Sequence, residues 1–186
     1  ITFKKLISIA YLNRVSLSSS GFYKTPKIYV DKKTLKGRPF LYFCYGAAVS
    51  EVIIDTLTGE NKLIKVDILQ DVGNSINPSI DIGQIEGAFV QGLGWLTSEE
   101  LTWAKNGNLL THSPSTYKIP VMQDIPINFK TNFYKTKGNS ENVVNKSKAV
   151  GEPPLLLALS AFFAIKNAIS YVRKNNKVDL SAPATP

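Results

Sequence analysis

Residues 147–169 read Ser-Lys-Ala-Val-Gly-Glu-Pro-Pro-Leu-Leu-Leu-Ala-Leu-Ser-Ala-Phe-Phe-Ala-Ile-Lys-Asn-Ala-Ile. The apolar second half predicts a long helix, and Pro153 and Pro154 suit its first turn, where backbone N–H groups have no intrahelical partner. Gly151 allows another group to approach the backbone closely. Glu152 lies between the glycine and the prolines, at the positive end of the predicted helix dipole. Two interpretations are open: a carboxylate that caps the first turn, or a general base at the edge of a pocket.

Two further blocks of sequence precede this stretch. The first runs from Asp67-Ile68-Leu69-Gln70-Asp71-Val72-Gly73 through Asn77-Pro78 to Asp81-Ile82-Gly83-Gln84-Ile85-Glu86-Gly87-Ala88-Phe89-Val90-Gln91-Gly92-Leu93-Gly94, and the second is Pro114-Ser115-Thr116-Tyr117-Lys118-Ile119-Pro120. Together with residues 147–154, and in this order, they resemble the C-terminal signature of the molybdenum hydroxylases, specifically of the xanthine dehydrogenases. The resemblance extends from about Phe3 to Val172, and the text between the blocks is most similar to bacterial-type large subunits.

The resemblance implies a role for four residues. Glu152 matches the family's general base, which favours the second of the two interpretations. Gln84 matches a glutamine whose amide contacts the pyranopterin of the molybdenum–molybdopterin cofactor, since an amide donates and accepts hydrogen bonds without adding charge. The alternative for Gln84 is an amide that faces solvent or caps a neighbouring loop. Val150 and Gly151 match backbone that lies against the metal ligands, and no residue of this chain is expected to bind the metal itself.

The resemblance also implies an oxidoreductase. We expect molybdenum-dependent hydroxylation of hypoxanthine and xanthine to urate, with water as the oxygen source and electrons passing through 2Fe-2S clusters and FAD to NAD. These centres and the purine-orienting residues are expected in upstream domains or on another subunit. Residues 1–186 would then be the C-terminal half of one molybdopterin-binding domain, inactive alone and part of an oligomer in the complete enzyme.

Two alternatives to a xanthine dehydrogenase remain open. One is an aldehyde oxidase or another N-heterocycle hydroxylase of the same family. The other is a non-catalytic interaction domain on the same scaffold. The combination of Gln84, Gly151 and Glu152 argues against the interaction domain, because a scaffold without chemistry has no need of it.

The composition of the chain argues against several other classes of protein. Its 22 Lys and Arg residues outnumber its 14 Asp and Glu residues, for a formal net charge of +8, but the lysines are scattered and form no basic stripe of the kind that binds nucleic acid. Cys44 and His112 are the single residues of their types, so neither a disulfide framework nor a zinc site is expected, and the lone thiol fits a reducing cytoplasm. The apolar run 155–165 is shorter than the roughly 18 residues of a membrane span, so we expect a buried helix and no membrane.

Apolar periodicity and turn residues predict an α+β fold in which β-hairpins pack against two long helices. Besides the helix after Glu152, the pattern predicts a helix over 3–16, a long loop over 22–39, a hairpin of strands 40–55 and 62–71, a helix over 78–101, a second hairpin of 101–103 with 109–111, and a strand over 125–134. Glycine inside a helix costs about 1 kcal/mol relative to alanine. We therefore expect close packing along one face of the helix 78–101, at Gly87, Gln91 and Gly94.

Overall fold

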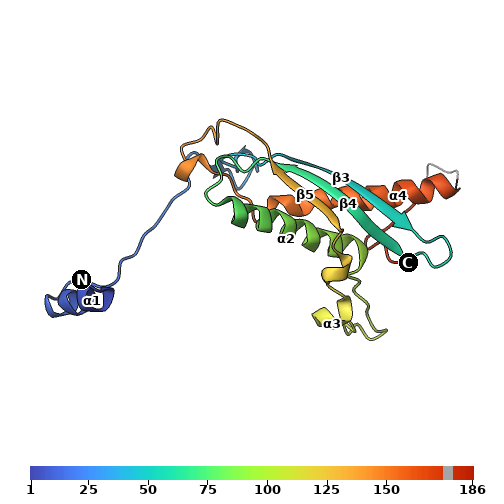
Figure 1. The fold of residues 1–186 in the computed structure, drawn as a ribbon, viewed down its shortest axis with the longest axis horizontal. Helices are drawn as coiled ribbons and strands as arrows, with labels where there is room; N and C mark the ends of the chain where they lie inside the picture. Colours follow the sequence, from blue (N-terminus) through green and yellow to red (C-terminus); the bar gives the residue numbers. More distant parts are fainter. Residues whose placement is uncertain (174–177) are drawn as a thin grey trace. The chain divides into compact units, whose positions relative to one another are not determined.

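The computed structural model describes residues 1–173 and 178–186. These residues divide into two compact units, Ile1–Leu41 and Tyr42–Pro186. Helices and two small sheets are present, which confirms the predicted α+β class (Figure 1). In chain order the elements are α1 (Phe3–Leu12), β1 (Tyr29–Val30), β2 (Gly37–Arg38), β3 (Gly46–Ile54), β4 (Asn61–Gln70), α2 (Pro78–Thr97), α3 (Pro114–Tyr117), the 3-10 helix η1 (Met122–Asp124), β5 (Asn128–Phe133), the 3-10 helices η2 (Val144–Lys146) and η3 (Pro153–Ala158), and α4 (Leu159–Arg173).

The first unit holds α1 and a short antiparallel pair of strands. α1 confirms the helix predicted over 3–16, but it ends early, and Arg14 takes a left-handed φ of 56° just beyond it. The prediction of a loop alone over 22–39 was wrong, because β1 and β2 pair there. The turn between them is closed by the Asp31 carboxylate, which accepts hydrogen bonds from the N–H groups of Lys33 and of the next residue. Those hydrogen bonds lower the pKa of Asp31.

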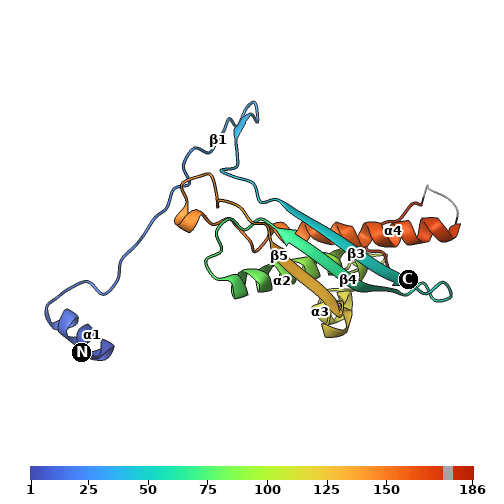
Figure 2. The ribbon, with the colours of Figure 1, turned by 45° about the horizontal axis from the view of Figure 1, so that its top comes forward.

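A three-stranded sheet in the order β3–β4–β5 is the frame of the second unit (Figure 2). β3 and β4 form an antiparallel hairpin, which confirms the prediction for 40–55 and 62–71. β5 confirms the strand predicted over 125–134 and pairs with β4 in parallel. Parallel pairing requires a crossover connection, and the chain between β4 and β5, which contains α2, provides it.

The predicted second hairpin, 101–103 with 109–111, does not form two strands. In this stretch, all of which the structure describes, one isolated antiparallel bridge joins Trp103 to Leu109. The turn itself is present, since the Ala104 N–H donates to the Asn108 carbonyl at 2.8 Å. Most residues on either side of it are exposed. No packed face therefore extends the pairing into a ladder.

α2 and the continuous segment η3–α4 lie on the same face of the sheet (Figures 1 and 2). On β4, Val66 and Ile68 point to this face and are buried, whereas Val49 and Ile53 of β3 point to the other face and are exposed. Phe89 of α2 makes an edge-to-face contact with a phenylalanine of β5, with ring centroids 5.5 Å apart. The buried core consists of Leu63, Val66, Ile68, Val72, Ile85, Phe89, Leu93, Ala158 and Ala161.

α2 confirms the helix predicted over 78–101, but close packing occurs at only one of the three predicted positions. A Cβ built on Gly92 would lie 2.3 Å from the carbonyl oxygen of Leu155 in η3, and Gly94 is packed as tightly against Pro120. A Cβ built on Gly87 would meet no atom within 4 Å, and Gln91 is exposed. The prediction was therefore right for Gly94 and wrong for Gly87 and Gln91.

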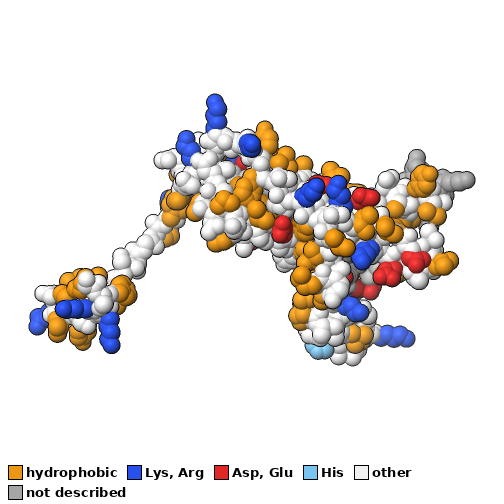
Figure 3. All heavy atoms as spheres, in the orientation of Figure 1, with side chains coloured by type: hydrophobic (Ala, Val, Ile, Leu, Met, Phe, Trp, Pro, Cys, Tyr) orange, Lys and Arg blue, Asp and Glu red, His pale blue; other side chains and the backbone are white. Residues whose placement is uncertain are grey.

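The segment Pro153–Val172 is long and apolar enough to cross a membrane by length and composition alone, with 20 residues and a mean hydropathy of 1.7. This segment is longer than the apolar run 155–165 because the residues on either side of that run keep its mean hydropathy high. A core helix meets the same criteria, and here Ala158, Ala161 and Ile165 are buried in the core. Only 17% of its most apolar 18-residue stretch is buried, and hydrophobic side chains also occur over the visible surface of the second unit (Figure 3). The predicted buried helix is thus buried on one side.

Candidate functional site

Gln84 and Gly151 lie side by side, although they are far apart in the chain. Gln84 is on the second turn of α2, and Gly151 comes two residues before η3; both are exposed. A Cβ built on Gly151 would lie 3.2 Å from the Gln84 side-chain oxygen, Oε1. The bare backbone at Gly151 therefore leaves the space beside the amide free of side-chain atoms.

Glu152 occupies the N-cap position of η3 but does not cap it. Its side chain makes no capping hydrogen bond, and the residue is exposed next to Gly151. Its backbone carbonyl accepts a hydrogen bond from the Leu155 N–H at 3.1 Å. Pro153 and Pro154 have no N–H groups, so the first turn offers few donors to a capping carboxylate. Glu152 is thus an exposed carboxylate that does not cap η3 and directly follows Gly151 in the chain.

The turn after β4 holds the segment that leads to this surface. Gly73 and Ser147 form an antiparallel bridge, and the Lys148 N–H donates to the Val72 carbonyl at 2.9 Å. Gly73 has a φ of 62°, and a Cβ there would lie 2.4 Å from the Lys146 carbonyl oxygen. Only glycine fits such a position without strain. Two of the sequence blocks that carry the family resemblance are therefore in direct contact.

Val150 joins this anchored segment to the exposed site. Its side chain is half-buried and packs against the hydrophobic core. The chain thus passes from a packed valine to an exposed glycine and an exposed glutamate within three residues. The structure brings all four predicted site residues, Gln84, Val150, Gly151 and Glu152, to one place.

Sequence reasoning assigned no role to Lys148 and Asp71, which form an ion pair. Lys148 Nζ lies 2.6 Å from Asp71 Oδ2, and the two side chains are 11% and 5% exposed. A signal was present, because each of these charged residues stands in one of the blocks that carry the resemblance. Nothing in the sequence indicated that the two residues meet.

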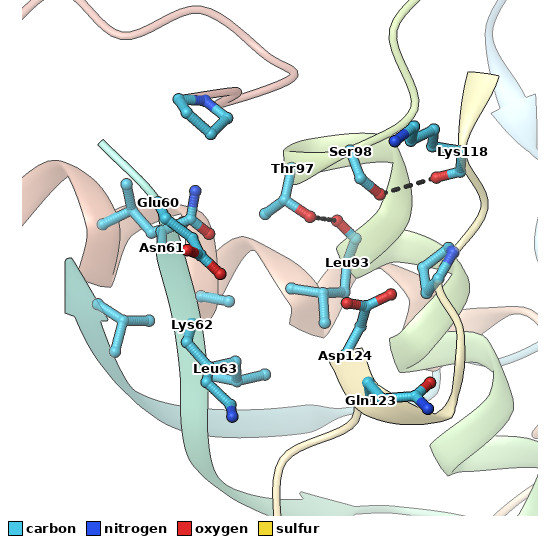
Figure 4. A pocket seen from close by; sticks show the side chains of 15 residues that line it. Glu60, Asn61, Lys62, Leu63, Leu93, Thr97, Ser98, Lys118, Gln123 and Asp124 are labelled. Carbon is cyan, nitrogen blue, oxygen red and sulfur yellow. Dashed lines mark hydrogen bonds between the residues drawn. The ribbon is translucent and has the colours of Figure 1, made fainter. Parts of the chain in front are cut away.

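A pocket of about 510 Å³ lies elsewhere, where the start of β4 faces the C-terminal end of α2 (Figure 4). Two of its hydroxyl groups serve the fold: Thr97 and Ser98 each donate a hydrogen bond to a backbone carbonyl, at 2.7 and 3.0 Å. Gln84 and Glu152 are not among the lining residues. The pocket is therefore separate from the candidate site.

The candidate site is suited to an organic ligand more than to a metal ion. Within residues 1–173 and 178–186, no group of three or more His, Cys, Asp or Glu side chains could hold a metal. Gln84, Gly151 and Glu152 offer an amide, an open stretch of backbone and a carboxylate. An amide, an open backbone and a carboxylate can pair with a ligand edge that presents hydrogen-bond donors and acceptors together.

Cys44 supports the segment before the site from a second direction. Its Sγ donates to the Ala149 carbonyl at 3.1 Å. Burial raises the pKa of the Cys44 thiol, and the nearby charge of Lys148 opposes that effect. A raised pKa means that less thiolate, the reactive form, is present at a given pH.

We therefore expect alkylation of Cys44 by iodoacetamide to be several times slower in the folded protein than in the urea-unfolded protein at about pH 8. The difference should shrink as the pH rises, because the folded thiol then ionises as well. Mass spectrometry of the Cys44 peptide gives both rates. Equal rates in the folded and unfolded protein at every pH would contradict the expectation.

The sequence matches known proteins over nearly its whole length. The profile of the molybdopterin cofactor-binding domain matches residues 1–126. The chain is 52% identical to the xanthine dehydrogenase/oxidase of Felis catus and 52% identical to that of Gallus gallus, with 97% of this chain and 14% of each enzyme covered. It is 47% identical to the xanthine dehydrogenase of Dictyostelium discoideum, over 100% of this chain and 14% of that enzyme. The chain thus spans about 14% of the length of these curated relatives.

Solved structures share the fold. The quinoline 2-oxidoreductase of Pseudomonas putida 86 has a TM-score of 0.64 and 28% identity, covering 73% of this chain and 16% of that one. The aldehyde oxidoreductase of Desulfovibrio gigas has a TM-score of 0.63 and 26% identity, covering 81% of this chain and 15% of that one. The curated relatives named above are eukaryotic, and the bacterial-type subgroup stays a prediction.

Proposed function

This chain belongs to the molybdenum hydroxylase family, as part of its molybdopterin cofactor-binding domain, and we propose that it supplies the general base and part of the cofactor pocket of a purine hydroxylase. In this proposal Glu152 is the base, and Gln84, Val150 and Gly151 contact the molybdenum–molybdopterin cofactor. The activity is that of the complete enzyme, since this chain corresponds to 14% of its curated relatives.

The observation that carries the proposal is the proximity of Gln84 to Gly151, at 3.2 Å from a built Cβ to the amide oxygen. An exposed amide lies beside an open stretch of backbone where α2 and η3 approach each other, and the exposed Glu152 follows that backbone directly. The Gln84 amide can pair with both donors and acceptors on a pterin edge. A larger residue at 151 would fill the space that the ligand needs.

When bound, the molybdenum centre supplies the redox and Lewis-acid chemistry that places a water-derived oxygen on an electron-poor carbon. Glu152 takes up, on a carboxylate oxygen, the proton that this water must lose. The first turn of η3 fixes the backbone of Glu152 on one side. Val150, packed against the core, fixes the chain on the other side. The backbone that carries the Glu152 carboxylate is thus fixed on both sides.

Hypoxanthine and xanthine are the proposed substrates. Xanthine dehydrogenases and xanthine dehydrogenase/oxidases are 47–53% identical to this chain, whereas the Desulfovibrio gigas aldehyde oxidoreductase is 26% identical. In the complete enzyme, 2Fe-2S clusters and FAD in other domains or subunits would carry the electrons to NAD. The partner of this chain is the rest of the enzyme. Exposed apolar side chains, Leu156 of η3 and Phe163 of α4 among them, give that partner an apolar surface to cover.

Steady-state turnover of the purified complete enzyme with xanthine and with an aldehyde tests the substrate proposal, with molybdenum content measured in parallel. We expect urate formation from xanthine with a kcat/KM at least about tenfold above that for the aldehyde, as a site built for a polar substrate discriminates strongly. The opposite preference would move the enzyme to the aldehyde class. A folded enzyme that never contains molybdenum would favour a non-catalytic scaffold.

The Gln84→Leu substitution in the complete enzyme should lower its molybdopterin occupancy. Leucine removes the amide but keeps most of the volume, and one or two lost hydrogen bonds at about 1 kcal/mol each weaken cofactor binding by roughly five- to thirtyfold. Molybdopterin and molybdenum are quantified per protein after dialysis. Gln91→Leu is the matched control, because Gln91 is an exposed glutamine on the same helix, away from Gly151. Equal occupancy in the two variants would contradict the role of Gln84.

A further inference from the structure

The ammonium group of Lys148 is held at three points. Its Nζ lies 2.6 Å from Asp71 Oδ2 and donates to the Phe43 carbonyl at 2.9 Å. It also lies 5.4 Å from the centroid of the Tyr45 ring, within the range of a cation–π contact. The side chains of the ion pair are 11% and 5% exposed. Lys148 is thus bound to both the turn after β4 and the chain that enters β3.

Burying an ion pair is a poor means of stabilising a fold. Removing two charges from water costs free energy that their mutual attraction often fails to recover, and apolar replacements are commonly as stable. The chain also holds an ordinary surface pair, Lys65 with Asp67, at 3.1 Å with side chains 44% and 40% exposed. The burial of Lys148 and Asp71 therefore calls for a reason other than stability.

The backbone next to this pair is fixed by further contacts. The Lys148 N–H donates to the Val72 carbonyl at 2.9 Å. The Ala149 N–H donates to the Tyr42 hydroxyl at 3.1 Å, and the Ala149 carbonyl accepts from Cys44 Sγ at 3.1 Å. The backbone of residues 148 and 149 is thus hydrogen-bonded to the same two segments that the Lys148 side chain contacts, the turn after β4 and the chain that enters β3.

Gly151 and Glu152 follow these residues directly, and they are exposed. The backbone at 148 and 149 is the last part of the chain before the site to be held by hydrogen bonds from two other segments. A small displacement of a catalytic group can cost about a hundredfold in rate. A fixed anchor within four residues of a base limits such displacements.

We propose that Lys148 and Asp71 are positioning residues, which lock the chain before Glu152 so that its carboxylate is held in the productive place. The inference rests on the proposed role of Glu152 as the base. Neither residue touches the reacting atoms; each acts through the backbone of residues 148–152. The buried charge pair serves as a specific two-point contact, which an apolar pair of similar volume would not reproduce.

The test uses the complete enzyme with Lys148→Met, Asp71→Asn and the double variant, and the surface pair Lys65→Met/Asp67→Asn as matched control. Four quantities are measured in each: molybdenum content, kcat and KM for xanthine, the thermal midpoint, and hydrogen exchange of peptides covering residues 143–152. Single variants leave one buried polar partner behind, whereas the double variant removes both charges. The double variant therefore separates loss of stability from loss of positioning.

We expect Lys148→Met to lower kcat at least tenfold with KM changed less than threefold, and to speed exchange at the Lys148 and Ala149 amides. In the double variant the thermal midpoint should return toward wild type while kcat stays low and exchange stays fast. The surface control should match wild type in all four measurements. Asp71→Asn keeps the Lys148 contact to Phe43, so its kcat and exchange rates should fall between those of wild type and Lys148→Met. Asp71→Asn replaces Lys148→Met in the test if Lys148→Met fails to fold.

Recovery of kcat together with the thermal midpoint in the double variant would overturn the proposal, because the pair would then serve stability alone. Unchanged exchange at residues 148 and 149 in every variant would overturn it as well. Failure of the proposed function is recognised separately, through a Glu152→Gln enzyme that turns over at the wild-type rate. In that case, fast exchange in Lys148→Met would show that Lys148 anchors residues 148 and 149, but these residues would have no catalytic base to position.

Discussion

Replacing Glu152 with glutamine in the complete enzyme is expected to lower kcat for xanthine by at least about a hundredfold, as is typical for the loss of a general base. Glutamine keeps the shape of the side chain but cannot take up a proton near neutral pH. The side chain makes no capping hydrogen bond in the structure, so the substitution should leave stability within about 0.5 kcal/mol of wild type, as for other surface changes. The expected signature is therefore a large loss of turnover without a loss of folding.

The measurement is steady-state and single-turnover urate formation, with molybdenum content and thermal midpoint determined on the same preparations. Glu86→Gln is the matched control: Glu86 is on α2, and its Oε1 accepts a hydrogen bond from the Thr131 hydroxyl at 3.2 Å, which a glutamine oxygen can still accept. A fully loaded Glu152→Gln enzyme with wild-type turnover would remove Glu152 from the mechanism. An enzyme that loses its molybdenum would instead point to a role in holding the cofactor.

Local sequence patterns predicted the elements of the second unit well. The hairpin of β3 and β4 followed from strand-forming residues on both sides of a turn, and α2 from apolar periodicity after turn residues. The parallel pairing of β5 with β4 was not predictable, because a single strand carries no information about its partner. The predicted hairpin around residues 105–108 had the right turn but no packed face to extend it.

The candidate site also has parts that the sequence predicted and parts that only the fold shows. Glu152 and Gln84 were reached through the family resemblance, and the local signal alone favoured a capping glutamate. Their proximity depends on how α2 packs against η3, which the spacing of glycines did not reveal. The contact of Lys148 with Asp71 joins residues that are distant in the chain, and only the fold shows it.

The packing of α2 against η3 leads to the second large expected effect, which compares two glycines of one helix. Both Gly87→Ala and Gly92→Ala gain about 1 kcal/mol of helix propensity. At Gly87 the new methyl group meets no atom within 4 Å, whereas at Gly92 it would lie 2.3 Å from the Leu155 carbonyl oxygen and 2.9 Å from Ala158 Cβ. The first of these neighbours is backbone, so η3 must move away from α2.

Overpacking of this kind costs about 1–3 kcal/mol, and a backbone neighbour places Gly92→Ala at the upper end. We expect Gly92→Ala to be about 2 kcal/mol less stable than wild type and Gly87→Ala up to about 1 kcal/mol more stable, a difference of about 3 kcal/mol by urea unfolding. Because η3 carries Glu152 at its start and α2 carries Gln84, the same displacement should separate Gln84 from Gly151. Gly92→Ala should therefore also lose molybdopterin occupancy, measured as for Gln84→Leu, while Gly87→Ala keeps it. Equal stability of the two variants would mean that η3 can move away from α2 at no cost in free energy. The spacing between α2 and η3 would then not determine the geometry of the site.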